Sequence, residues 1–122
     1  MDELRIVLPW PPSINNYWRN YRGRTVISAK GRQWKKDALV ELIAQGIPRN
    51  RISCRLAVWI DQYPPDRRRR DIDNPVKVAA DLLVSAEVIA DDSLIDALSI
   101  QRHEPQAPGK FVIRIQEYAK VV

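Results

Sequence analysis

The chain contains few of the side chains that most often carry redox or nucleophilic chemistry, with one cysteine and one histidine among 122 residues. Cys54 has no second cysteine with which to form an intrachain disulfide, so we expect a reducing, cytoplasmic setting. It falls in a strand-like segment, where packing is its expected role. His103 stands apart from the charged motifs of the chain, which disfavours it as a general base and favours a surface or structural role.

Long hydrophobic runs are absent as well. No apolar stretch approaches the roughly 20 residues that span a bilayer. The first four residues, Met1–Leu4, lack the basic and apolar regions of a signal peptide, and we expect no association with a membrane. The length suits a single domain, residues 1–122, and no repeat, low-complexity tract or linker divides it.

Charge, in contrast, is plentiful. The chain has 20 Lys and Arg against 15 Asp and Glu, a formal net charge of +5. A solvated basic surface would explain that total, but in the N-terminal third basic residues interleave with aromatic ones, as they do on nucleic-acid contact surfaces. The basic residues are Arg19, Arg22, Arg24, Lys30, Arg32, Lys35 and Lys36, and the aromatic ones are Trp10, Tyr17, Trp18, Tyr21 and Trp34.

Hydrophobic periodicity predicts two helices. The first runs from Ser28, its N-cap, to about Gln45, and Gly46 takes the position where a left-handed residue ends a helix. One stripe of this helix is traced by Trp34, Ala38, Leu42 and Gln45. The second runs from Pro75 to about Ser85, with Asn74 as its N-cap and proline at the first helical position. The segment 94–102 fits either a helix or a strand.

Three segments alternate apolar and polar residues as half-buried strands do: Leu4–Leu8, Ile52–Ile60 and Phe111–Gln116. Residues 9–28 predict an extended, irregular loop that is too aromatic to be disordered. The order β-α-β-α-β-β predicts an α+β (mixed α/β) fold, a single domain in which helices pack on a mixed sheet. That sheet cannot be purely antiparallel if the helices are crossovers.

One segment joins a basic block to two carboxylates. The block is Arg67, Arg68, Arg69 and Arg70; Asp71 and Asp73 follow directly, and Lys77 stands four residues further on. Arginine side chains grip phosphate oxygens, and clustered aspartates hold Mg²⁺, so the segment is able to hold a phosphodiester and hydrolyse it. In an extended segment the two aspartates lie on the same side, and Arg70, Lys77 or Mg²⁺ would offset their repulsion.

Lys77 breaks a local rule. With Asn74 as N-cap it stands at the third helical position, where the helix dipole disfavours a cation by roughly 0.3–1 kcal/mol. Such exceptions tend to mark functional sites. The alternatives are a surface ion pair with Asp73, or Asp81 as an i,i+4 partner. We favour a lysine that neutralises charge on a phosphate in the transition state.

A second acidic pair, Asp91 and Asp92, follows the second helix. That helix ends on the order of 16 Å from its start. The five residues 86–90 are long enough to bring the chain back over that distance. A metal site shared between this pair and Asp71 and Asp73 is therefore feasible.

These motifs resemble the RusA family of Holliday junction resolvases. The likeness covers about Leu4 to Gln116. It rests on Asp71-x-Asp73-Asn74-x-x-Lys77 with Asp91-Asp92, and on Pro11-Pro12-Ser13-x-Asn15 and Gly23-Arg24 followed by Ser28. The resemblance implies a Mg²⁺-dependent homodimer, in many cases encoded by a phage or prophage, that makes paired symmetric cuts in four-way DNA junctions.

The resemblance also implies roles for individual residues. Asp71, Asp73 and Asp92 would be metal ligands and Lys77 the essential basic residue, while Arg70 and its neighbours would contact backbone phosphates. The residues expected to bind nucleic acid are Arg67, Arg68, Arg69, Arg70, Lys77, Arg22, Arg24, Lys30 and Arg32. No organic cofactor is expected. The chain departs from the family pattern at Pro75, where a larger aliphatic residue is common, and in 94–102, a strand in the family that has helical propensity here.

The expected function is resolution of four-way junctions in DNA recombination and repair. One alternative is a metal-dependent nuclease acting on flaps, forks or RNA, because phosphate contacts do not encode the shape of a junction. Another is a non-catalytic DNA-binding protein whose aspartates are turn residues. Transfer of a sugar through the Asp-x-Asp pair is disfavoured, since 122 residues leave little room for a nucleotide-sugar domain.

Overall fold

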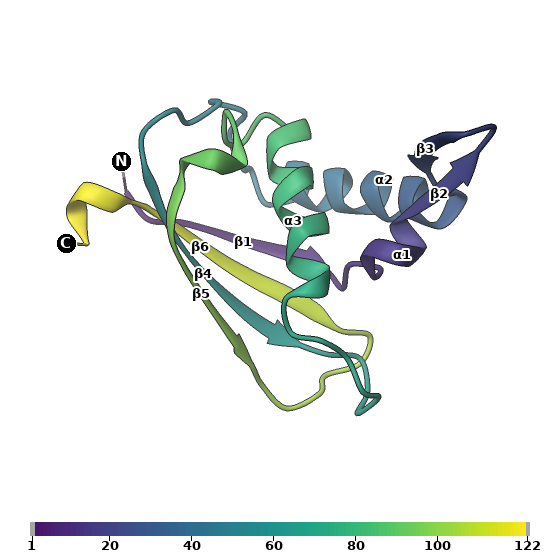
Figure 1. Cartoon of the computed structure of the whole chain (residues 1–122). Coiled ribbons are helices and arrows are strands. Elements are labelled where there is room, and N and C mark those ends of the chain that lie inside the picture. The colour runs from purple at the N-terminus through teal and green to yellow at the C-terminus, as the bar shows by residue number, and fades with distance from the viewer. Residues whose placement is uncertain (1, 122) are drawn as a thin grey trace.

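The computed structural model describes residues 2–121 as a curved four-stranded sheet with helices packed on it and a small hairpin projecting to one side (Figure 1). The strands are β1 (Leu4–Pro9), β4 (Leu56–Tyr63), β5 (Ile95–Arg102) and β6 (Lys110–Glu117), in the order β1-β6-β4-β5. Strand β6 is antiparallel to β1 and β4, whereas β4 and β5 are parallel. The predicted α+β fold with a mixed sheet is confirmed.

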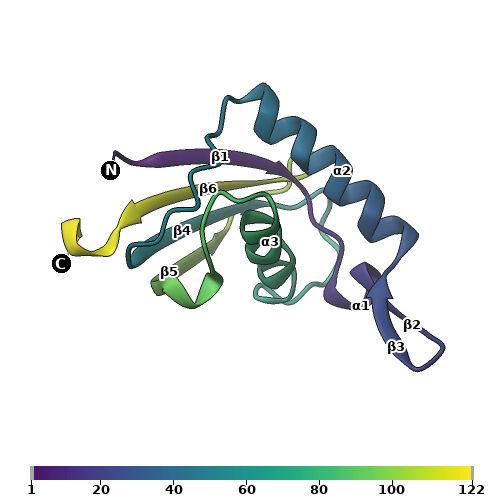
Figure 2. The same ribbon diagram turned by 90° about the horizontal axis from the view of Figure 1, so that it is seen from above.

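The core lies between one face of the sheet and two helices, α2 (Ala29–Ala44) and α3 (Asn74–Ser85) (Figure 2). The strands contribute Ile6, Leu8, Leu56, Val58, Ile60, Phe111, Ile113 and Ile115, all nearly inaccessible to solvent. Alternation along each strand places these side chains on the same face. Both helices turn their apolar residues toward this face. The segments that carry the aspartates connect α3 to strands of this sheet.

Helix α2 follows the prediction closely. Ser28 is its N-cap and accepts a hydrogen bond from the Gly31 amide at 2.9 Å, and Gly46 has the left-handed φ of 69° expected after the C-terminus. Trp34 is buried on the inward face with two further residues of the predicted stripe, Ala38 and Leu42. Gln45, the last residue of that stripe, is exposed instead, and its amide bridges the main chain of Val7 in β1 at 2.7 and 2.8 Å.

Residues 9–28 are not the irregular loop that we expected. They form a short helix α1 (Ile14–Tyr17) and a hairpin of β2 (Trp18–Tyr21) and β3 (Arg24–Ile27). The turn consists of Arg22 and Gly23, both at positive φ, 50° and 76°. The two-residue turn of such a hairpin needs a positive φ at both positions, and Asn-Gly or Asp-Gly is the usual sequence. Because arginine takes the first position here, the sequence does not indicate the turn.

Strand β4 is shifted toward the C-terminus relative to the prediction. It begins at Leu56 rather than Ile52 and continues past Ile60 to Tyr63, whereas Ile52 forms only an isolated bridge with Ile89. Cys54, in the segment before β4, packs partly buried against the core. Of the ambiguous segment 94–102, Ile95–Arg102 form the edge strand β5, because their main chain pairs with Leu56–Gln62 of β4. Family resemblance therefore predicted this segment better than helical propensity did.

Helix α3 connects β4 to the parallel strand β5 and is the crossover that we expected. It begins one residue earlier than predicted: Asp73, not Asn74, is the N-cap, and Lys77 is therefore the fourth helical residue rather than the third. The Asn74 side chain instead accepts a hydrogen bond from the Ile14 amide at 2.9 Å, which ties α1 to the start of α3. None of the helices within residues 2–121 is both long and apolar enough to cross a membrane.

Candidate active site and nucleic-acid interface

The loop between β4 and α3, residues 64–73, carries the arginine block and the first two aspartates. Asp66 organises its first half, since it accepts a hydrogen bond from the Arg68 amide at 2.9 Å and forms an ion pair with Arg70 at 2.8 Å. The Arg68 amide, and then the two guanidinium groups, hold the pKa of Asp66 below its usual value. From β5, Arg102 donates to the Arg70 carbonyl at 2.7 Å. This loop is therefore fixed at several points along its length.

Asp71 and Asp73 are exposed at the end of this loop. Asp73 is the N-cap of α3, yet its side chain makes no capping hydrogen bond, although aspartate at this position usually accepts one from the helix main chain. Within residues 2–121 neither carboxylate forms an ion pair or hydrogen bond with another side chain. Two acidic groups two residues apart thus remain free to accept an external cation.

An open cleft of about 500 Å³ runs between this loop and the N-terminal ends of α1 and α2. Its charged lining consists of four cations, Lys30, Arg68, Arg69 and Arg70, and one anion, Asp71. Trp10 and Trp34 contribute aromatic walls. A cleft of this charge suits a phosphate backbone, and its aromatic walls are suited to contact sugars or bases.

The four arginines of the block differ in their surroundings. Arg69 and Arg68 are exposed and line the cleft, and Arg68 approaches Asp66 at 3.6 Å. Arg67 is paired with Glu104 across a neighbouring loop. Arg70 is half-buried, paired with Asp66 and placed 5.6 Å from the ring of Trp10. Its guanidinium therefore supports the loop in this structure, in addition to lining the cleft.

Lys77 is exposed on α3, one turn after Asp73. Neither of the two ion pairs considered from the sequence, with Asp73 or with Asp81, is formed. No other described residue offers Lys77 a partner either. A cation near a helix N-terminus without a counter-charge is unfavourable, so an external anion beside Lys77 would relieve a local electrostatic cost.

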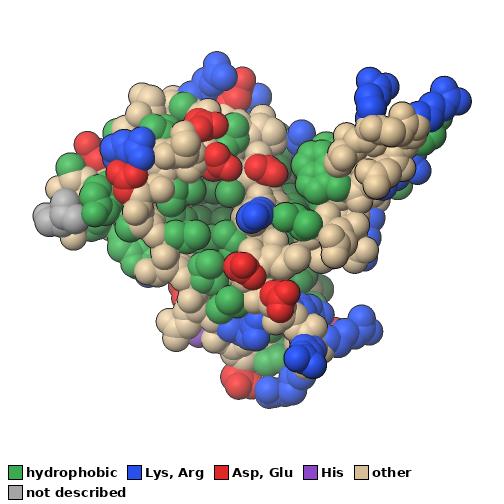
Figure 3. Space-filling model, viewed as in Figure 1, with side chains coloured by type: hydrophobic (Ala, Val, Ile, Leu, Met, Phe, Trp, Pro, Cys, Tyr) green, Lys and Arg blue, Asp and Glu red, His purple; other side chains and the backbone are tan. Residues whose placement is uncertain are grey.

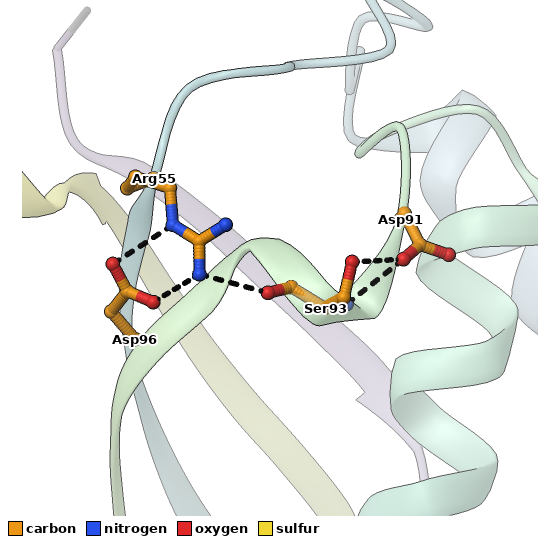
Figure 4. A network of polar contacts seen from close by, with 4 residues as sticks. All are labelled: Arg55, Asp91, Ser93 and Asp96. Carbon is orange, nitrogen blue, oxygen red and sulfur yellow. Dashed lines mark hydrogen bonds and ion pairs between the residues drawn. The ribbon is translucent and has the colours of Figure 1, made fainter.

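Asp91 and Asp92 lie where the chain turns from α3 into β5, and they have different roles (Figure 4). Asp91 caps the short 3₁₀ helix η1 (Asp92–Leu94) by accepting hydrogen bonds from the amide and hydroxyl of Ser93. These bonds lower the pKa of Asp91. Arg55 holds the same turn in place through Asp96 and the Ser93 carbonyl. The side chain of Asp92 forms none of the hydrogen bonds drawn in Figure 4.

Asp92 lies near Asp81 of α3 rather than near the first acidic pair. Burial raises the pKa of Asp81, and the charge of Asp92 raises it further. The two side chains line one surface depression with Tyr17 and Lys35. Because Asp81 stands eight residues after Asp73, the two acidic groups are separated by roughly 12 Å along the helix.

The expected convergence of Asp92 on Asp71 and Asp73 is therefore not formed within one chain. Over residues 2–121, no three Asp, Glu, His or Cys side chains are close enough together to hold a metal ion. The carboxylates of Asp71 and Asp73 nevertheless fit a hard divalent cation, since they are oxygen donors with no protein partner. Asp81 is an additional acidic residue beside Asp92. The sequence analysis had considered it only as an ion-pair partner of Lys77.

The other predicted binding residues are distributed over the hairpin and α2. Arg22 and Arg24 lie on the projecting hairpin, where Arg19 and Arg22 flank the exposed ring of Tyr21 at 5.2 and 5.3 Å. Arg32 donates to the Ile27 carbonyl at 2.9 Å and so supports the hairpin base. On the face seen in Figure 3, basic side chains gather on the hairpin and along the lower loops, with acidic side chains between them.

His103 has the structural surroundings that we expected. It hydrogen-bonds Asp61 at 2.7 Å and stacks on Tyr63, with ring centroids 4.7 Å apart. These contacts place it at the end of β5, apart from the two acidic positions.

The fold and these features define a small, basic α+β domain with a cationic cleft next to unpaired carboxylates. A family model described as endodeoxyribonuclease RusA matches residues 9–116 of the chain. The chain belongs to this family.

Individual relatives are similar over almost their whole length. A crossover junction endodeoxyribonuclease RusA from Shigella sonnei is 35% identical over 117 residues, covering 96% of this chain and 97% of the relative. A protein of the same name from Escherichia coli is 34% identical over the same coverage. The protein of that name from Enterobacteria phage HK97 is 36% identical over 121 residues, covering 99% of this chain and 100% of the relative.

Proposed function

We propose that this chain is an endodeoxyribonuclease that resolves four-way DNA junctions by hydrolysing one phosphodiester in each of two opposed strands. The observation that carries the proposal is the cationic cleft that ends at Asp71, in a chain of the RusA family. The four cations of the cleft bind the backbone on both sides of the reacting phosphate and set its position relative to the loop.

Mg²⁺ is the proposed cofactor, and Asp71 and Asp73 are its proposed ligands, with Asp92 as the third. When bound, a divalent cation supplies an activated water and polarises the phosphate. Because Asp92 lies beside Asp81 in the isolated chain, its contribution requires the assembled enzyme or the DNA complex to bring it closer. Asp73 is suited to its role because its carboxylate is not used in capping α3.

Lys77 is proposed to contact the phosphate that reacts. Its ammonium group neutralises the negative charge that grows on the phosphate oxygens as the nucleophile adds. The absence of a carboxylate partner for Lys77 among the described residues leaves its charge available for this purpose. Its position one helical turn from Asp73 places both groups on the same side of α3.

The test compares cleavage of a synthetic four-way junction, a replication fork and a linear duplex, with and without Mg²⁺. Junction resolution predicts paired cuts at symmetric positions in the four-way substrate and little cutting of the duplex. Preferential cutting of the fork would assign the chain to the flap and fork nucleases instead. Junction binding that survives chelation, with no cleavage under any divalent cation, would identify a non-catalytic binding protein.

A further inference from the structure

Gln62 is a polar residue in a core position. It continues the inward-facing stripe of Leu56, Val58 and Ile60 on β4, and its side chain is 1% exposed. Within residues 2–121, and apart from the aromatic Tyr17 and Trp34, it is the one buried residue with a polar or charged side chain. A buried amide is unfavourable unless it is hydrogen-bonded. The hydrogen bond of the Gln62 side chain therefore offsets the cost of its burial.

The Gln62 side chain reaches the acidic loop. Its amide nitrogen donates a hydrogen bond of 2.7 Å to the main-chain carbonyl of Ile72, the residue between Asp71 and Asp73. The peptide group held by this bond joins Ile72 to Asp73. Its orientation determines where the two flanking side chains leave the main chain.

Gln62 itself is held firmly. It pairs with Phe111 of β6 on one side and with Arg102 of β5 on the other. Its main-chain carbonyl accepts a hydrogen bond of 2.8 Å from the His103 amide. The other anchors of the loop, Arg102 and Asp66, are more exposed. Water replaces a fully exposed hydrogen bond more easily than the bond from Gln62 to Ile72, which is part-buried and whose donor side chain comes from the core.

We infer that Gln62 is a positioning residue, which transmits the rigidity of the sheet to the loop and fixes Asp71 and Asp73 for the reaction. This inference rests on the function proposed above. Residues that orient a catalytic carboxylate without touching the substrate typically contribute about 10- to 100-fold to activity or metal affinity. Replacement of Gln62 should therefore affect turnover more than binding of DNA.

The test uses Gln62→Met, which keeps the length of the side chain but has no donor for the Ile72 carbonyl. Gln62→Leu, an apolar side chain of different shape that also has no donor, guards against poor packing of methionine. Gln45→Met is the matched control, because Gln45 also bridges main-chain groups but lies at the end of α2, away from the loop.

We expect both Gln62 variants to lower kcat by about 10- to 100-fold while KM for the junction and junction binding in a chelator stay unchanged. Hydrogen exchange at the amides of residues 71–73 should become faster, and exchange in β4 and β6 should not. Gln45→Met should keep the kcat of the unmodified chain. Wild-type turnover and exchange in the Gln62 variants, or an equal loss of kcat in Gln45→Met, would overturn the inference.

The two proposals fail separately. If Asp71→Asn and Asp73→Asn cleave junctions as well as the unmodified chain, the proposed function of these carboxylates is wrong, whatever Gln62 does. If those variants are inactive and Gln62→Met is fully active with unchanged exchange, the proposed function stands and the positioning role of Gln62 is wrong.

Discussion

Asp73 stands at a helix N-cap and leaves its carboxylate unused there. In an ordinary cap that group would satisfy an amide of the first turn, but here the side chain makes no such bond. Asp91 is the contrasting case, since one oxygen of its carboxylate accepts two hydrogen bonds from Ser93 and caps η1. The same residue type therefore serves structure at one position and is available for chemistry at the other.

Asp73→Asn should abolish cleavage and leave junction binding close to that of the unmodified chain. The change removes a ligand charge but keeps the size of the side chain and the helix start. Cleavage is measured with Mg²⁺, and binding is measured with a chelator. Asp37→Asn, on the exposed side of α2, is the matched control for charge. Loss of both binding and folding in Asp73→Asn would show that Asp73 is structural.

Ser93→Ala should raise the pKa of Asp91 part of the way toward its usual value of about 3.9, because the change removes the Ser93 hydroxyl, the largest cause of the lowering, and keeps the amide. A depressed folded pKa means that this cap stabilises the fold above the unfolded pKa and is lost as the pH falls through the folded value. A carbon NMR titration of the aspartate carboxyls measures the shift. An unchanged Asp91 pKa in Ser93→Ala would contradict the assignment.

At the scale of elements, the acidic positions are set by one unit, β4-α3-β5. The loop before α3 carries Asp71 and Asp73, and the turn after it carries Asp92. Because α3 is a continuous helix, its length separates the two positions. Bringing them to one cation is therefore a matter of moving the turn at η1, or of assembly with a second chain, rather than of bending the helix.

The sequence predicted the elements whose signals are local. Ser28 and Gly46 marked both ends of α2, and alternation located β1 and β6. The hairpin was missed because arginine, rather than the usual asparagine or aspartate, adopts the positive φ before Gly23. Gln62 was missed because the predicted strand stopped at Ile60. An extension of the same alternation by one step would have placed a glutamine in the core.

The site was predicted less completely than the fold. The loop arginines and the acidic pair remain predicted site residues, and the cleft brings Lys30 to this loop from a distant part of the sequence. Spacing could not show that Asp92 would lie beside Asp81, because the path of residues 86–90 depends on tertiary bonds. One of these bonds joins the Ala90 amide to the Ile52 carbonyl at 2.9 Å.

The projecting hairpin should bind DNA through charge. Replacing Arg19, Arg22 and Arg24 together by Gln should weaken junction binding and make its dependence on salt less steep, by roughly 0.9 in logarithmic slope for each phosphate that the variant no longer neutralises. Affinity is measured over a series of salt concentrations in a chelator. Replacing Arg5, Arg49 and Arg51 by Gln removes the same charge away from the hairpin and is the control. Equal effects of both triple variants would contradict a specific role for the hairpin.

For the whole molecule, one chain offers one pair of loop aspartates, and a four-way junction needs two opposed cuts. We therefore expect a two-fold homodimer, in which identical sites face a substrate of matching symmetry. The face shown in Figure 3 has a hollow with hydrophobic side chains beside α3, which is compatible with a contact surface.

Sedimentation should give the mass of two chains at concentrations at which junctions are resolved. A mixed dimer of unmodified and Asp73→Asn chains should nick one strand and fail to cut its opposite. The products on a denaturing gel distinguish a single nick from paired cuts. A single-chain mass under resolving conditions, or paired cuts by the mixed dimer, would contradict this arrangement.

The division of the chain also bears on how such enzymes diversify. The hairpin and its supporting helix precede residue 46, whereas the acidic positions all fall between residues 71 and 92. Exchange of the segment before residue 46 between relatives would change the hairpin but keep both aspartate loops, provided that Lys30 and Trp34, which also line the cleft beside Asp71, are retained. Chimaeras joined in the connection before β4 would be the natural starting point for engineering resolvases with new targets.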